Sequence, residues 1–163
     1  MLSIIIVFVS AFVYETAQQT VTQTVTNIAT LTLKNSALGT IEEGETKSYT
    51  NVTVAELGAA IDITTTKANV YLHLDSDIDS LSAYYTTYDV TVKFATVPGG
   101  SVLHTSGDTA ATITLASPDT LTAIDLDAAG SWTFDFEVTT TADSVSADQP
   151  TTATIVVTAE STT

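Results

Sequence analysis

The chain has 163 residues and a formal net charge of −15 at pH 7, from 19 acidic residues and four lysines. It contains no cysteine and no arginine, which excludes disulfide bonds and thiolate metal sites. Four lysines cannot form a basic patch in so acidic a chain, so nucleic acid is excluded as a partner. The length and the 44% hydrophobic composition predict one globular domain with a core.

The first 14 residues carry no charge, whereas the other residues carry all 23 charged side chains, 19 acids and four lysines. A secretory signal begins with basic residues, and none precedes this apolar run. A membrane-spanning helix needs about 20 apolar residues, but Glu15 ends the run first. We therefore expect the run to be buried against other copies of the chain. A secretory signal, a membrane-spanning helix and burial against other copies would each place the protein outside the cytoplasm.

We predict an assembly segment over residues 1–30 and a β domain over residues 31–163. Apolar residues at spacings of three and four continue to Ile28 and favour a helix, whereas the many threonines after Gln19 make a donated strand the second choice. The predicted assembly residues share large apolar side chains: Leu2, Ile4, Ile5, Ile6, Val7, Phe8, Val9, Phe12, Val13, Tyr14, Val21, Val25 and Ile28.

The rest of the chain alternates apolar and polar residues over short stretches that are separated by turn residues. This pattern predicts strands within 70–74, 90–94, 111–115, 132–138 and 153–157, and turns at 98–100, 106–108 and 117–119. The 34 threonines also favour strands, because Thr is β-branched. We expect a mainly β fold, an Ig-like antiparallel β-sandwich, with Trp132 as its core anchor.

The chain shows little sign of catalysis. Asp75, Asp77 and Asp79 alternate as the ligands of a Ca²⁺ loop do, but a solvated strand end explains them better. Asp125 and Asp127 fit the polar face of a strand, and the two histidines, His73 and His104, lack any ligand spacing. We expect no cofactor, no resident metal ion and no enzymatic activity.

Two further features concern the surface. Tyr84, Tyr85 and Tyr88 form a cluster that suits either subunit contact and ligand stacking or packing in the core and at its rim. Asn51-Val52-Thr53 is an N-glycosylation acceptor triplet, so Asn51 is a candidate glycosylation site.

The stretch from Leu2 to Ile28, followed by a Thr-rich β domain without cysteine, resembles archaeal type IV pilin-like proteins, including archaellins. That resemblance implies helices bundled in a filament core. Residues 41–49 and 129–138 are similar to segments of TasA-type biofilm fibre subunits and archaeal bundling-pilus subunits. This second resemblance implies a strand donated from one subunit to the next.

Both interpretations predict a structural subunit of an extracellular filament for adhesion, aggregation or motility, with the chain itself as main partner. Burial of about 13 apolar side chains contributes on the order of 20–40 kcal/mol before ordering costs. A head-to-tail contact that does not close gives a helical polymer. The alternative is a monomeric surface module that binds a glycan, a cation or a surface-layer protein.

Overall fold

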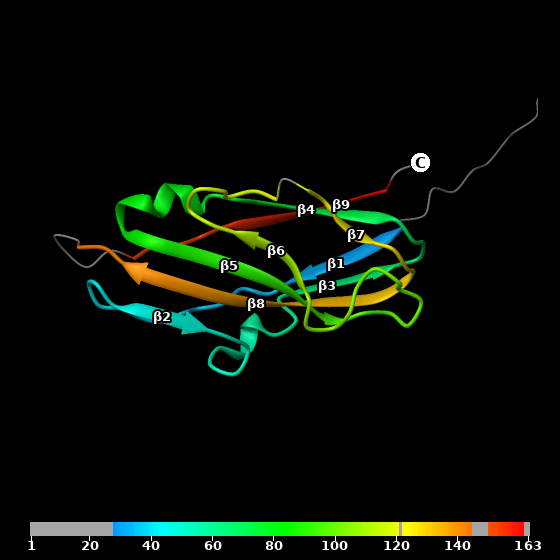
Figure 1. Cartoon of the computed structure of the whole chain (residues 1–163), viewed down its shortest axis with the longest axis horizontal. Helices are drawn as coiled ribbons and strands as arrows, with labels where there is room; N and C mark the ends of the chain where they lie inside the picture. Colours follow the sequence, from blue (N-terminus) through cyan, green and yellow to red (C-terminus); the bar gives the residue numbers. More distant parts are fainter. Residues whose placement is uncertain (1–27, 121, 145–149, 162–163) are drawn as a thin grey trace, which may run out of the picture.

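The computed structural model describes residues 28–120, 122–144 and 150–161 (Figure 1). These residues form two antiparallel β-sheets with one hydrophobic core between them, which confirms the expectation of a mainly β chain. The helix or donated strand expected over residues 1–30 lies outside the described residues up to residue 27. Residues 29 and 30 already belong to the first strand.

The larger sheet has the order β1-β3-β8-β5-β6, and β2 also pairs with β8. Its strands are β1 (Ala29–Leu33), β2 (Thr46–Tyr49), β3 (Ile61–Thr65), β5 (Tyr85–Thr96), β6 (Thr109–Ile113) and β8 (Gly130–Ala142). Strand β8 has 13 residues and is about 40 Å long at the usual rise per residue. One edge of β8 pairs with β5, and the other is shared by β3 and β2.

The smaller sheet has the order β7-β4-β9, with β7 (Ile124–Leu126), β4 (Val70–Ser76) and β9 (Ile155–Ser161). Two short 3-10 helices join strands: η1 (Ala55–Leu57) lies between β2 and β3, and η2 (Ile78–Ala83) lies between β4 and β5. Helix η2 carries the chain from the smaller sheet to the larger one, and it buries Ile78 and Leu81.

The core forms because one face of each strand is apolar. In β4 the three aliphatic residues are fully buried, whereas Tyr71 and His73 between them are half-buried. Phe94 lies at the centre, with its ring centroid 5.9 Å from that of Trp132 and 5.0 Å from that of Phe134. The buried Trp132 indole N–H donates to the Ala128 carbonyl at 3.0 Å. The prediction that Trp132 anchors the core is confirmed.

Two strands lack residues at one end that the alternation pattern had assigned to them. Strand β6 stops at Ile113 rather than continuing to residue 115, because Thr114 and Ser117 exchange backbone hydrogen bonds of 3.0 Å and close a turn. Strand β9 begins at Ile155 rather than at residue 153. The Thr154 amide donates to the Asp77 carboxylate at 2.7 Å, and its carbonyl accepts from the Asp77 amide, so this residue binds the loop before η2 instead of pairing with β4.

Replacement of Trp132 tests this core. Trp132→Ala should lower the free energy of unfolding by about 3–5 kcal/mol, because it leaves a cavity and removes the indole hydrogen bond. Urea unfolding of the purified protein measures the change. Val156→Ala, at a side chain that is 53% exposed, is the control and should change stability by less than about 0.5 kcal/mol. Equal losses for the two variants would contradict the assignment.

Candidate interaction surfaces

The two ends of the domain carry different features. At the end where β1 begins, which we call the β1 end, Thr65 pairs with both Ala29 and Gly130. At the opposite end, which we call the tyrosine end, Tyr85 pairs with Ala142. Figure 1 shows β5 and β8 running side by side from one end to the other. The two ends are therefore separated by the length of β8.

The tyrosine end has a groove of about 1180 Å³ that we call the tyrosine groove. It lies beside the inner face of the larger sheet, and its other walls are residues 36–43 and 150–153. The groove opens where the smaller sheet stops, since the last pair of β4 and β9 at this end joins Ser76 to Ile155. Four tyrosines line it: Tyr49, Tyr84, Tyr85 and Tyr88.

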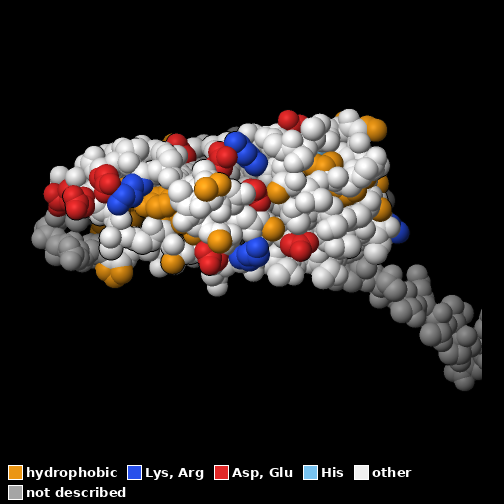
Figure 2. Space-filling view, turned by 90° about the horizontal axis from the view of Figure 1, so that it is seen from below, with side chains coloured by type: hydrophobic (Ala, Val, Ile, Leu, Met, Phe, Trp, Pro, Cys, Tyr) orange, Lys and Arg blue, Asp and Glu red, His pale blue; other side chains and the backbone are white. Residues whose placement is uncertain are grey.

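The tyrosines form a neutral lining with an acidic rim. The rings of Tyr85 and Tyr88 meet edge to face with centroids 5.2 Å apart. Burial, assisted by the neighbouring Tyr85, raises the pKa of Tyr88 to about 12, so this side chain stays uncharged at neutral pH. Glu42, Glu43 and Asp143 are exposed along the groove. Figure 2 shows acidic side chains gathered over this end.

The β1 end carries a loop of residues 98–104 that we call the tip loop. The Asp127 carboxylate accepts three hydrogen bonds from this loop: one from the Ser101 hydroxyl at 2.6 Å and two from the amides of Val102 and Leu103 at 2.7 and 3.0 Å. These bonds fix the backbone and leave both apolar side chains in solvent, with exposed fractions of 89% for Val102 and 61% for Leu103.

Two packing contacts anchor the base of the tip loop. The half-buried ring of His104 stacks on Phe94 with centroids 4.3 Å apart, and its Nε2 lies 2.6 Å from the Asp125 carbonyl oxygen. Pro98 packs on Gly130, where a β-carbon would lie 2.9 Å from the Pro98 Cβ and where φ is +138°. Only glycine suits that position. His104 therefore has a structural contact, and the loop is attached to the core.

The three residues of the predicted acidic cluster are exposed, and Asp77 takes part in local structure. Asp75 is exposed near the end of β4, Asp77 precedes η2, and Asp79 is exposed within η2. The Asp77 carboxylate accepts the Thr154 amide. Within residues 28–120, 122–144 and 150–161, no three histidine or acidic side chains come together in a way that could hold a metal ion.

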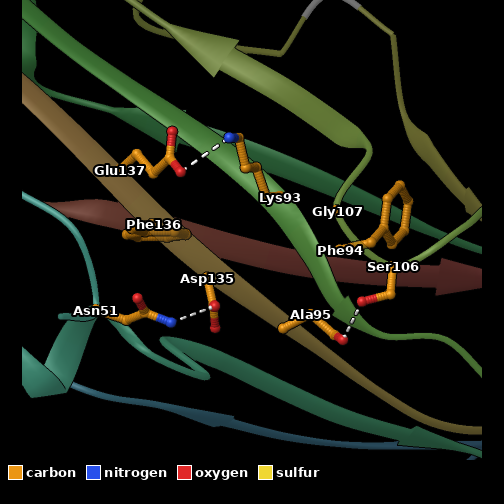
Figure 3. Close-up of a pocket in the computed structure, with 9 residues that line it drawn as sticks. All are labelled: Asn51, Lys93, Phe94, Ala95, Ser106, Gly107, Asp135, Phe136 and Glu137. Carbon is orange, nitrogen blue, oxygen red and sulfur yellow. Dashed lines mark hydrogen bonds and ion pairs between the residues drawn. The ribbon is translucent and has the colours of Figure 1, made fainter.

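Asn51 lies in a shallow hollow of about 200 Å³ on the outer face of the larger sheet (Figure 3). Its amide Nδ2 donates to Asp135 at 2.8 Å, and the other Asp135 oxygen accepts the Ala59 amide at 2.7 Å. Lys93 and Glu137 form an ion pair of 2.8 Å beside it. Asn51 is exposed, as a glycosylation acceptor must be, but its amide group already has a partner in the folded domain.

Of the predicted assembly residues, only Ile28 is described. It is partly buried and packs against the core of its own domain, while its carbonyl accepts hydrogen bonds from Thr66 at the β1 end. The other twelve, from Leu2 to Val25, lie outside the described residues. Within the described part of the chain, no helix is both long and apolar enough to cross a membrane.

Sequence reasoning identified the tyrosine cluster and the turns that bracket the tip loop, but it missed the loop itself. The available signal was Val102-Leu103, an apolar pair between the turns at 98–100 and 106–108. The role of Asp127 was also missed, because its partners lie about 25 residues away. No protein-family model and no curated protein matches this chain.

The pKa of Asp127 gives a test of the tip loop. Burial alone would raise this pKa, but the hydrogen bonds from Ser101, Val102 and Leu103 outweigh it and bring the pKa below its ordinary value. The stabilisation is thus complete above the ordinary Asp pKa of about 3.9 and is lost as the pH falls through the lower folded value.

We expect the NMR amide signals of Val102 and Leu103 to titrate together at a pH below about 3.9, and Asp127→Asn to abolish that titration. The Val52 amide, which donates to the Thr50 hydroxyl, is an internal control that should not follow this transition. A midpoint at or above the ordinary value would show that the carboxylate does not hold the loop.

Proposed function

We propose that this chain is a structural subunit of an extracellular, pilus-like filament and that it polymerises through the N-terminal segment that precedes the domain, residues 1–27. The observation that carries the proposal is the uncharged apolar run of residues 1–14 in a chain whose net charge is −15. Such a run is most stable when it is buried, and other copies of the same chain can bury it repeatedly.

The position of Ile28 supports this proposal. The Ile28 carbonyl accepts the Thr66 amide at 2.9 Å, so the preceding residues join the domain at the β1 end. Attachment at one end of an elongated domain leaves the opposite end free to face the next subunit. Repetition of one such contact gives an open polymer rather than a closed dimer.

Within this proposal the two-layer β structure is an Ig-like sandwich, and residues 1–27 form either a helix, which we favour, or a donated strand. One observation supports the second mode. Strand β9 pairs only with β4 among the described strands, so its other edge offers backbone groups to an added strand. Val156 on this strand is 53% exposed.

The acidic surface suits the outer face of such a filament, because like charge keeps neighbouring filaments and subunit sides apart. We propose adhesion, aggregation or motility as its use, with the chain itself as principal partner and with glycans or other surface components as further partners. The proposal includes no catalytic role and no cofactor.

Removal of residues 1–17 tests the proposal. The truncated protein should remain folded but fail to polymerise, because it lacks the apolar run, and electron microscopy with sedimentation velocity should show monomers.

Phe8→Asp in the full chain should also block assembly, since it buries a charge, whereas the matched control Ser10→Asp should have the smaller effect. Filaments of the truncated protein at native rates would overturn the role of this segment. Particles of a single size from the full chain would instead support a monomeric surface-binding module.

A further inference from the structure

The tip loop presents an apolar pair in a preorganised form. Val102 and Leu103 are adjacent and exposed, and their amides are held by one carboxylate, that of Asp127. Because the loop is already ordered, little conformational entropy is lost when these side chains bind a partner. Residues 97–107 also contain no acidic side chain and no lysine, so the loop offers a partner no charged side chain of its own.

The tyrosine groove suits the tip loop in size and chemistry. Its volume of about 1180 Å³ exceeds what a valine and a leucine side chain require, and tyrosine rings provide apolar contact area at small entropic cost. The groove belongs to the tyrosine end, whereas the tip loop belongs to the β1 end (Figure 1). The loop therefore cannot enter the groove of its own domain.

Lys67 adds one attractive charge contact between opposite ends. Glu42, Glu43 and Asp143 border the groove. Lys67 is exposed in the turn between β3 and β4 at the β1 end, and it forms no salt bridge within the described part of the chain. Opposed ends of two copies would bring Lys67 toward an acidic rim. Glu160, which pairs with Tyr71, is also exposed near the β1 end, and Asp127 lies under the tip loop. This attraction is therefore local to Lys67, and the head-to-tail orientation rests on the tip loop and the groove.

We infer that the occupant of the tyrosine groove is the tip loop of a second copy of this chain, with Val102 and Leu103 inserted among the tyrosines. This inference rests on the proposed filament function and adds a second contact between successive subunits, separate from residues 1–27. The contact is heterologous and leaves one free tip loop and one free groove at the ends of any row of subunits.

Cysteine cross-linking of the full chain tests the contact directly, because the protein has no cysteine of its own. Ala37 lines the groove and is exposed. The double variant Ala37→Cys/Leu103→Cys should form a ladder of disulfide-linked oligomers under mild oxidation. The control Val52→Cys/Leu103→Cys, with its first cysteine on an exposed turn that does not line the groove, should form such species at least about tenfold more slowly, by collision alone.

Charge insertion gives a second measurement with a matched control. Val102→Asp/Leu103→Asp should weaken self-association at least about tenfold, because two carboxylates would have to enter an acidic, tyrosine-lined groove. Val52→Asp changes the same residue type at the same exposed fraction, 89%, and should alter association by less than about twofold. Circular dichroism should show both variants folded, since all three side chains are exposed.

The outcomes separate this inference from the proposed function. Filaments that form normally in Val102→Asp/Leu103→Asp, together with no ladder above the control, would overturn the tip-to-groove contact and leave the filament proposal standing. A ladder above the control, in a protein that still polymerises without residues 1–17, would support the tip-to-groove contact and overturn the role proposed for the N-terminal segment. Efficient cross-linking of Ala37→Cys to Val13→Cys, but not to Leu103→Cys, would identify the N-terminal segment as the occupant and also overturn the inference.

Discussion

The pairing of β8 with β5 is the interaction on which the rest of the structure depends. It runs from Tyr85 opposite Ala142 to Thr96 opposite Thr133, and it holds Phe94 beside Phe134 in the core. Two long paired strands are stiff, so features at their ends stay about 40 Å apart. The apolar loop at one end and the groove at the other therefore cannot meet within one molecule, as the proposed head-to-tail contact requires.

The second edge of β8 shows how the chain tolerates a break in a sheet. Strand β3 covers the edge opposite residues 130–134 and β2 covers it opposite 138–141, so the residues between them lack a strand partner on that side. Asp135 lies in this gap, and its carboxylate accepts hydrogen bonds from the Ala59 amide and the Asn51 side chain. A side chain thus replaces part of a missing ladder and ties the loop containing η1 to the sheet.

Electrostatic repulsion restricts where two copies can touch. A net charge of −15 on one small domain opposes close approach over roughly a Debye length, about 8–10 Å at moderate ionic strength. Contacts between copies are then favoured where carboxylates are absent. Stretches without a carboxylate include residues 1–14, 16–41 and 90–107, the last of which contains the tip loop. Ile28 and the tip loop belong to two of these stretches, and both lie at the β1 end.

Local alternation let the sequence by itself determine the strand class, the buried face of β4, β5 and β8, and the central position of Trp132. A strand with one buried face must alternate, so this information is present within a few residues. The sequence also determined the net charge, the absence of thiol chemistry and the presence of an uncharged N-terminal run.

Only the tertiary structure decided what depends on contacts between distant residues. The alternation around Asp127 indicated a polar position but not that its carboxylate orders the tip loop, because Ser101 lies 26 residues away in the chain. The tyrosine cluster was visible in the sequence, whereas the groove required residues 36–43 and 150–153 to come together beside it. The ends of β6 and β9 were likewise decided by hydrogen bonds that compete with strand pairing. The alternation of apolar and polar residues does not indicate such competition.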